Sequence, residues 1–180
     1  MPTSKILDVG CGYGRILSTL YQNEFHNLIG IDPSFKMIER GKNEHPYLDL
    51  REYDKTKLPF ENNSFDSVIL SGVLTCIIDN QEQIALIEEI KRIMRKNGII
   101  YVNDFLLNTD ARNLERYNLF KNQYNFGAFE LPEKVVLRHH AKEWIVDLFN
   151  CFETFEFKDI TYTTMNGNKS NGFYFIGGKK

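Results

Sequence analysis

Short apolar runs, rich in β-branched residues, recur along the first 105 residues of the chain. Such runs predict buried strands, and most of the stretches between them can form a helix. The expected strands cover residues 5–9, 27–31, 48–53, 65–71 and 98–105. Strands that alternate with helices in this way predict an α/β fold, in which a parallel sheet carries helices on both faces.

The clearest helix is expected at residues 80–96. Four apolar side chains fall on one face of it: Ile84, Ile87, Ile90 and Met94. Asp79 and Glu82 can form a capping box at its start, and the pair Asn97 and Gly98 provides a stop signal at its end. The stretch therefore has both the apolar stripe and the end signals of an amphipathic helix.

After residue 140 the order of elements changes. Residues 141–150 predict a helix, and residues 152–163 and 171–178 predict two strands. Because a short loop joins these strands, we expect them to be antiparallel. A chain of 180 residues that is 42% hydrophobic can bury the core of one domain of ordinary size. We therefore expect a single domain over residues 1–180.

Three glycines at alternate positions follow the first predicted strand: Gly10, Gly12 and Gly14. Glycine permits a positive φ and removes the Cβ that would keep a ligand away from the backbone. In a doubly wound sheet this turn lies at the carboxyl end of the strand, where ligands bind, and the N–H groups of such a loop favour an anionic group. A dinucleotide-binding G-x-G-x-x-G loop has a glycine where this chain has Arg15. An NAD(P)-dependent oxidoreductase is therefore the less favoured alternative.

The stretch ILDVGCGYGR resembles motif I of the class I S-adenosylmethionine-dependent methyltransferases, D/E-x-G-x-G-x-G, with Asp8 as the acidic member. The resemblance extends over residues 5–106. GIDPS is similar to the family's acidic motif after the second strand, and EYDKTKLPFENNSFDSVILSGVL to the segment with an adenine-binding aspartate. EIKRIMRKNGIIYVNDF is similar to the helix, turn and fifth strand, with Asn97 in place of a proline. The L-P-F and S-F-D patterns are most similar to small-molecule methyltransferases of type 11.

The resemblance implies a Rossmann-like doubly wound sheet of strand order 3-2-1-4-5-7-6, with strand 7 antiparallel. It also implies S-adenosyl-L-methionine as the cofactor and S-adenosyl-L-homocysteine (SAH) as the product. Asp8 would orient the ammonium group, Asp32 would accept both ribose hydroxyls, and Asp54 would accept from the adenine amino group. The expected cofactor-binding residues are Asp8, Gly10, Cys11, Gly12, Gly14, Asp32, Pro33, Met37, Tyr53, Asp54, Lys55 and Ser71.

Residues 107–140 exceed an ordinary loop and carry several aromatic side chains, which predicts a lid or an insertion that forms the acceptor site. The alternative is a small satellite core, with a histidine that caps the next helix. We expect the end of this segment to lie at the mouth of the sheet. The candidate catalytic residues are His139, His140 and Asp104. The candidate acceptor-binding residues are Tyr13, Thr75, Arg138 and Tyr117.

The segment after the fourth strand narrows the acceptor class. It reads Ser71, Gly72, Val73 and Leu74, whereas enzymes that methylate exocyclic amines of nucleobases carry N/D/S-P-P-Y/F. The net charge of −2 provides no long-range attraction to nucleic acid or to an anionic membrane. We expect methyl transfer to an O or N atom of a small molecule, with no nucleic-acid partner, no membrane partner and no metal.

Two further expectations concern location and partners. Three cysteines without zinc-like spacing indicate a reducing cytoplasm, and no apolar run approaches the roughly 18 residues of a membrane-spanning helix. Class I enzymes usually carry helices before the first strand, whereas four residues precede the strand predicted at 5–9. The cover of the cofactor is therefore expected from residues 107–140, from a second copy or from a partner subunit; the alternative is a truncated form of the chain with an open site. A catalytically silent cofactor-binding or interaction protein is the non-enzymatic alternative.

Overall fold

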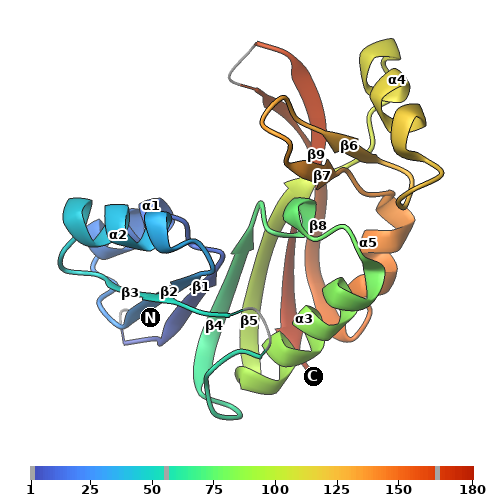
Figure 1. The fold of residues 1–180 in the computed structure, drawn as a ribbon. Coiled ribbons are helices and arrows are strands. Elements are labelled where there is room, and N and C mark those ends of the chain that lie inside the picture. The colour runs from blue at the N-terminus through green and yellow to red at the C-terminus, as the bar shows by residue number, and fades with distance from the viewer. Residues whose placement is uncertain (1–2, 55–56, 165–166) are drawn as a thin grey trace.

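The computed structural model describes residues 3–54, 57–164 and 167–180 (Figure 1). Its main sheet has seven strands in the order β3-β2-β1-β4-β5-β9-β8. These strands are β1 (Ile6–Val9), β2 (Leu28–Asp32), β3 (Asp49–Glu52), β4 (Phe65–Ser71), β5 (Met94–Phe105), β8 (Phe152–Thr163) and β9 (Lys169–Lys179). The helices are α1 (Arg15–Gln22), α2 (Phe35–Glu44), the 3-10 turn η1 (Leu74–Cys76), α3 (Asn80–Ile93), α4 (Ala111–Phe120) and α5 (Lys142–Leu148).

The sheet is mixed, as expected for this α/β fold. Strands β3, β2, β1, β4 and β5 are parallel, and β9 is antiparallel to both β5 and β8. The predicted order 3-2-1-4-5-7-6 differs from the observed numbering because the chain forms two strands that were not predicted. These are β6 (Ala128–Glu130) and β7 (Val136–Arg138), which pair in a separate antiparallel sheet. Within the main sheet, β9 is the seventh strand along the chain.

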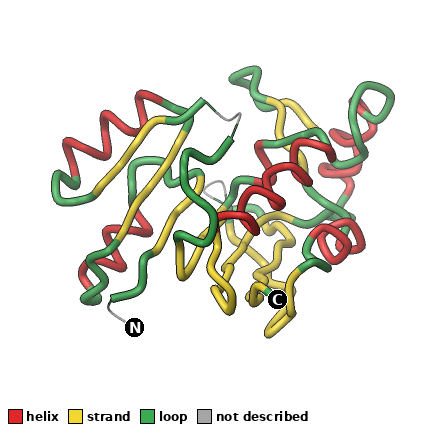
Figure 2. Tube along the Cα trace, turned by 90° about the horizontal axis from the view of Figure 1, so that it is seen from below, coloured by secondary structure: helices red, strands yellow, loops and turns green. Residues whose placement is uncertain are grey.

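Two hydrophobic clusters lie on opposite faces of the sheet. Alternate strand residues, such as Ile6 and Leu7, belong to different clusters because successive side chains of a strand point to opposite faces. Helices α1 and α2 cover one face over β1, β2 and β3, whereas α3 and α5 cover the other face over β4, β5, β8 and β9 (Figures 1 and 2). Among the described residues, no helix is long and apolar enough to cross a membrane.

The helix predicted at 80–96 ends earlier in the structure. The side chain of Asp79 accepts hydrogen bonds from the first-turn N–H groups, so this N-terminal cap is confirmed. At the other end, Met94 begins β5, is fully buried and pairs with Phe65 of β4. Asn97, with a φ of +62°, therefore lies inside β5 and does not stop the helix.

Residues 107–140 lie beyond the carboxyl ends of β4 and β5 (Figure 1). This segment has its own small core, in which Tyr117 of α4 and Phe129 of β6 are buried. Helix α4 packs against β6, and β7 packs against η1. The segment thus contacts the turn that follows β4, at the edge of the sheet where parallel strands present ligand sites.

Candidate cofactor and acceptor site

The glycine loop after β1 has left-handed backbone at all three glycines. The φ angles are +73° at Gly10, +56° at Gly12 and +86° at Gly14. A Cβ added to Gly10 would overlap the side chain of Val73, whereas a Cβ added to Gly12 would meet nothing within 4 Å. Gly10 is therefore needed for packing against the turn after β4. Gly12 leaves its backbone open to a ligand.

Asp32, at the end of β2, holds this loop in place. One carboxylate oxygen accepts from the N–H of Gly12 at 2.9 Å, and the other accepts from the N–H of Ser34 at 2.8 Å. Each carboxylate oxygen can accept a further hydrogen bond. Asp32 can therefore organise the loop and still bind two ligand hydroxyls.

A cavity of about 680 Å³ opens beside the loop. Five of the predicted cofactor-binding residues line it: Gly10, Asp32, Pro33, Tyr53 and Asp54. A volume of this size is within the range of small-molecule sites, about 300 to 1,000 Å³. The fold thus brings these motif residues, which are far apart along the chain, together at one cavity.

One wall of the cavity was not predicted. It is a stripe on α3 formed by Glu82, Ala85, Leu86 and Glu89, which are spaced so that they share one helical face. The apolar stripe of the same helix, which includes Ile87 and Ile90, packs on the sheet. The i, i+3, i+4, i+7 spacing of these cavity-lining residues is the sequence feature from which this wall could have been predicted.

Asp8 lies under the glycine loop with an unusual environment. It is 1% exposed, and neither carboxylate oxygen has a hydrogen-bond partner among the described residues. Burial, together with the nearby charge of Asp32, raises the pKa of Asp8 from 3.8 to about 7. An unpaired carboxylate is costly to bury, so this position favours a ligand that brings a positive charge.

Comparison with known proteins identifies the family. A family model described as a methyltransferase domain matches residues 7–102, which is more than half of the chain. The chain belongs to the S-adenosylmethionine-dependent methyltransferases. A solved S-adenosylmethionine-dependent methyltransferase from Methanosarcina mazei superposes with a TM-score of 0.91 and is 25% identical, over 99% of this chain and 93% of that one.

Curated relatives carry related names. A ubiquinone/menaquinone biosynthesis C-methyltransferase of Campylobacter jejuni is 25% identical over 177 residues, which cover 88% of this chain and 74% of that protein. A demethylmenaquinone methyltransferase of Renibacterium salmoninarum is 31% identical over 105 residues, which cover 58% of this chain and 43% of that protein. These names describe the relatives.

The cofactor of this methyltransferase is S-adenosyl-L-methionine, and the residues present fit it. The buried, unpaired carboxylate of Asp8 suits the ammonium group of a methionine moiety, and the open backbone at Gly12 leaves room for it. Several other predicted residues do not line the cavity: buried Asp8 and Cys11, Gly12, Gly14, Met37, which is exposed on α2, and Ser71 beside Gly72. Lys55 lies outside the described residues.

Asp104, a predicted base, holds a wall of the cavity of this methyltransferase. Its carboxylate accepts from the N–H of Thr75 at 3.2 Å and from the N–H of Phe105 at 2.7 Å. Burial raises its pKa to about 7, although these backbone hydrogen bonds act in the opposite direction. Asp104 is 2% exposed, and its carboxylate fixes the turn that contains Val73. The structure thus supports a structural role, and its catalytic role stays a prediction.

The two predicted catalytic histidines, at the end of the segment 107–140, are both buried. His139 Nδ1 lies 2.7 Å from the hydroxyl oxygen of Tyr117, and His140 Nε2 lies 2.8 Å from Nε2 of Gln83. Burial lowers the pKa of His139 to about 3 and that of His140 to about 4, so both rings are neutral at neutral pH. Neither ring lines the cofactor cavity. Their catalytic role also stays a prediction.

The predicted acceptor-binding residues do not form one site. Arg138 is 5% exposed and donates from Nη1 to a backbone carbonyl 2.9 Å away. Tyr117 and Thr75 are buried. Tyr13, in the loop after β1, has the guanidinium of Arg40 3.9 Å from its ring centre. Tyr13 is thus the member of this set that belongs to the glycine loop itself, between Gly12 and Gly14.

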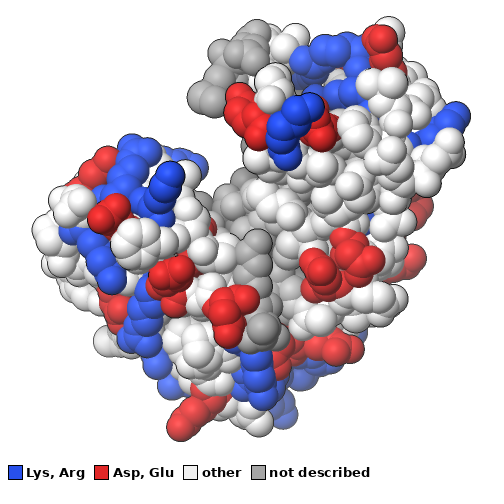
Figure 3. All heavy atoms as spheres, in the orientation of Figure 1, with Lys and Arg blue, Asp and Glu red and all other residues white. Residues whose placement is uncertain are grey.

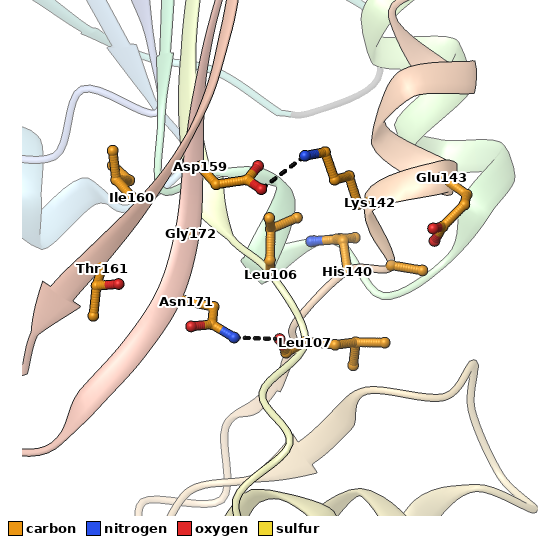
Figure 4. Close-up of a pocket in the computed structure, with 11 residues that line it drawn as sticks. Leu106, Leu107, His140, Lys142, Glu143, Asp159, Ile160, Thr161, Asn171 and Gly172 are labelled. Atoms are coloured by element: carbon orange, nitrogen blue, oxygen red, sulfur yellow. Dashed lines mark hydrogen bonds and ion pairs between the residues drawn. The ribbon is translucent and has the colours of Figure 1, made fainter.

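A second cavity, of about 470 Å³, lies between α5 and the strands β8 and β9 (Figure 4). His140 lines it, together with Lys142 and Asp159, whose Nζ and Oδ2 atoms form an ion pair at 2.7 Å. Of the residues that the structure describes, none lines both this cavity and the one beside the glycine loop. The end of residues 107–140 therefore borders a hollow other than the cofactor cavity.

Proposed function

We propose that this methyltransferase acts on a small molecule bound above the carboxyl ends of the strands, next to the cofactor cavity. The observation that carries the proposal is the cavity of about 680 Å³, in which the glycine loop, Asp32 and Asp54 meet. The space-filling view shows the surface hollowed between the part that carries α1 and α2 and the part that carries α4, β6 and β7 (Figure 3). Residues 107–140 form one side of this hollow, and we propose that they cover the bound acceptor.

The chain's own residues would bind and orient the reactants. Asp8 would pair with the ammonium group, Asp32 would accept from the ribose hydroxyls and Asp54 would accept from the adenine amino group. When bound, the cofactor supplies a methyl group on a positively charged sulfur, which needs no acid catalysis. Positioning of the acceptor would therefore supply most of the acceleration. A base is needed only where the acceptor is protonated at neutral pH.

The acceptor atom is proposed to be oxygen or nitrogen. The names of the curated relatives include quinone C-methyltransferases, which supports adding a reactive ring carbon to the acceptors that are tested. We propose no nucleic-acid partner, because the net charge of −2 provides no attraction to a phosphate backbone.

Two measurements test this function. SAH at about 100 times its Kd should stabilise the fold by about 2.7 kcal/mol, which corresponds to a rise in Tm of roughly 5 to 10 °C. NAD should produce no shift. A panel of phenols, carboxylates and amines should then contain at least one acceptor that causes SAH release. Stabilisation by SAH without release from any acceptor would indicate a silent binder, and stabilisation by NAD alone would indicate an oxidoreductase.

The affinity for SAH should rise with pH, because ionised Asp8 is the form that pairs with an ammonium group. With the pKa of Asp8 at about 7 in the folded protein, the affinity should increase about tenfold between about pH 6 and about pH 8. Calorimetric titration at several pH values measures this slope. Asp8→Asn should bind weakly and with a flat pH profile; a wild-type profile in this variant would contradict the pairing.

The ligand-free protein should show the opposite trend in stability. Because the pKa of Asp8 is raised in the folded state, its unfavourable contribution is absent below about pH 3.8 and grows as the pH rises through about 7. Asp104 acts in the same direction and over the same window. Asp8→Asn should therefore raise the Tm of the ligand-free protein near pH 8 while it weakens SAH binding.

A further inference from the structure

One face of the sheet is bare near the carboxyl end of β5. Side chains alternate along this strand, so Ile100 and Val102 are buried under α3 and α5, whereas Ile99 and Tyr101 on the opposite face are 44% and 36% exposed. No helix among the described residues covers that opposite face of β5. Asn103 lies on the same face but is partly buried, and it pairs with Ser71 at the carboxyl end of β4.

A tyrosine of the last hairpin reaches across this bare face. The ring of Tyr162, on β8, lies over Gly172 of β9, where an added Cβ would overlap it. Its hydroxyl lies 3.1 Å from Nδ2 of Asn103 on β5. Glycine at position 172 thus allows the tyrosine to cross one strand and place its hydroxyl at the next.

This hydroxyl is connected to a wall of the cofactor cavity through Asn103. Asn103 pairs in register with Ser71 of β4, and its carbonyl accepts from the N–H of Gly72 at 2.9 Å. Gly72 lines the cavity, has a φ of +66°, and an added Cβ would meet nothing within 4 Å. Asn103 therefore lies on the strand next to β4, and its backbone is hydrogen-bonded to Gly72, a residue of the cavity wall that is open to a ligand.

The hydrogen bond between Asn103 and Tyr162 leaves the hydroxyl proton of Tyr162 available as a donor. The amide of Asn103 donates to the Tyr162 oxygen, so the Tyr162 proton is not used in that bond. The Tyr162 hydroxyl has no other hydrogen bond in the part of the chain that the structure describes. Burial raises the pKa of Tyr162, which keeps the hydroxyl protonated at neutral pH. It can therefore donate to an oxygen of a ligand.

The side chains that contact this donor are aromatic or amide groups, and the carboxylate of the buried Asp104 also raises the pKa of Tyr162. The ring of Phe105 lies 5.0 Å from that of Tyr162 and stacks on His139 at 5.2 Å, and the buried His139 ring is neutral. Asn103, Phe105 and Tyr162 carry no charge. Carboxylates are held best by charged donors, so this set favours a neutral planar molecule over an organic acid.

We propose that Tyr162 binds the methyl acceptor of this enzyme, donating a hydrogen bond to the oxygen of a neutral phenol or quinol whose ring packs against Phe105. Asn103 is a positioning residue, because it acts by holding the Tyr162 hydroxyl. The inference rests on the proposed function, since it assigns the acceptor to the bare face beside the cofactor cavity.

The test uses binding of two probes of similar shape to the SAH-saturated protein, followed by NMR. Hydroquinone offers oxygens to Tyr162, whereas p-xylene has methyl groups in their place. Tyr162→Phe should weaken hydroquinone binding about tenfold, the loss expected for one hydrogen bond, and should leave p-xylene binding unchanged. Asn103→Leu should have a similar effect, and the double variant should bind no more weakly than Tyr162→Phe, because the two residues act through one hydroxyl.

Tyr174→Phe is the matched control. Tyr174 lies on β9, and its hydroxyl donates to Glu156, so the variant loses a tyrosine hydroxyl and its hydrogen bond elsewhere in the hairpin. Hydroquinone binding should be unchanged in it. The inference is overturned if Tyr162→Phe binds hydroquinone as the wild type does, if Tyr174→Phe is equally impaired, or if the SAH-saturated wild type does not bind hydroquinone. Failure of the wild type to bind SAH would instead contradict the proposed function.

Discussion

Gly12→Val is expected to weaken SAH binding strongly, while the ligand-free protein still folds with a modest loss of stability. A side chain at this position meets no protein atom within 4 Å, so it would occupy the space in which the ligand must approach the backbone. Overpacking of this kind costs about 1 to 3 kcal/mol, which corresponds to a loss of affinity of about fivefold to about 150-fold. Calorimetry measures the affinity, and thermal unfolding measures the stability.

The left-handed backbone adds a cost that needs its own control. Gly12 has a φ of +56°, and a β-branched residue is strained there. Gly167, in the loop between β8 and β9, has a φ of +76° and also no atom within 4 Å of an added Cβ. Gly167→Val should show a similar loss of stability with normal SAH binding. Equal binding by both variants would contradict the assignment of Gly12 to the cofactor site.

Gln83→Leu is expected to cause the largest loss of stability among these variants. Gln83 is fully buried in α3, and its amide group contacts the carbonyls of Leu74 and Ile77, the ring of His140 and the indole N–H of Trp144. Leucine would leave these buried groups without partners, at about 1 to 3 kcal/mol for each. A total of about 3 kcal/mol or more would lower the Tm by roughly 10 °C.

The same substitution two residues earlier is the control. Gln81 lies on the exposed side of α3, so Gln81→Leu should change the Tm by less than about 1 °C, in line with the effect of most surface substitutions. Gln83→Leu should also weaken SAH binding, because Ile77 lines the cofactor cavity. Equal Tm values for the two variants would show that the contacts of Gln83 contribute little.

The strands could be predicted because their signals are local. β4 and β8 begin and end at the residues that the apolar runs indicate, 65–71 and 152–163. The end of α3 could not, because Met94 suits both the apolar stripe of a helix and the core of a strand. Its pairing with Phe65 decides between them, and such a contact is not contained in the local pattern.

In the candidate site too, some residues could be placed from the local sequence pattern and others depend on contacts between distant parts of the chain. Gly10 follows β1 directly and Asp32 ends β2, so the alternation of strands and helices was enough to place both residues at one edge of the sheet. The place of His140 depends on Gln83, which is 57 residues away in the sequence. From the sequence, the position of His140 before a helix indicated a polar side chain at the mouth of the sheet. In the structure, His140 is buried and hydrogen-bonded to Gln83.

The buried carboxylate of Asp8 would also link the lifetime of this enzyme to its cofactor supply. Without a cationic partner, Asp8 weakens the fold near neutral pH. Binding of a ligand that supplies this partner lowers the fraction of unfolded chains, which are the chains that proteases degrade. Cells depleted of S-adenosylmethionine would then degrade this protein faster, and its abundance would follow the concentration of the methyl donor.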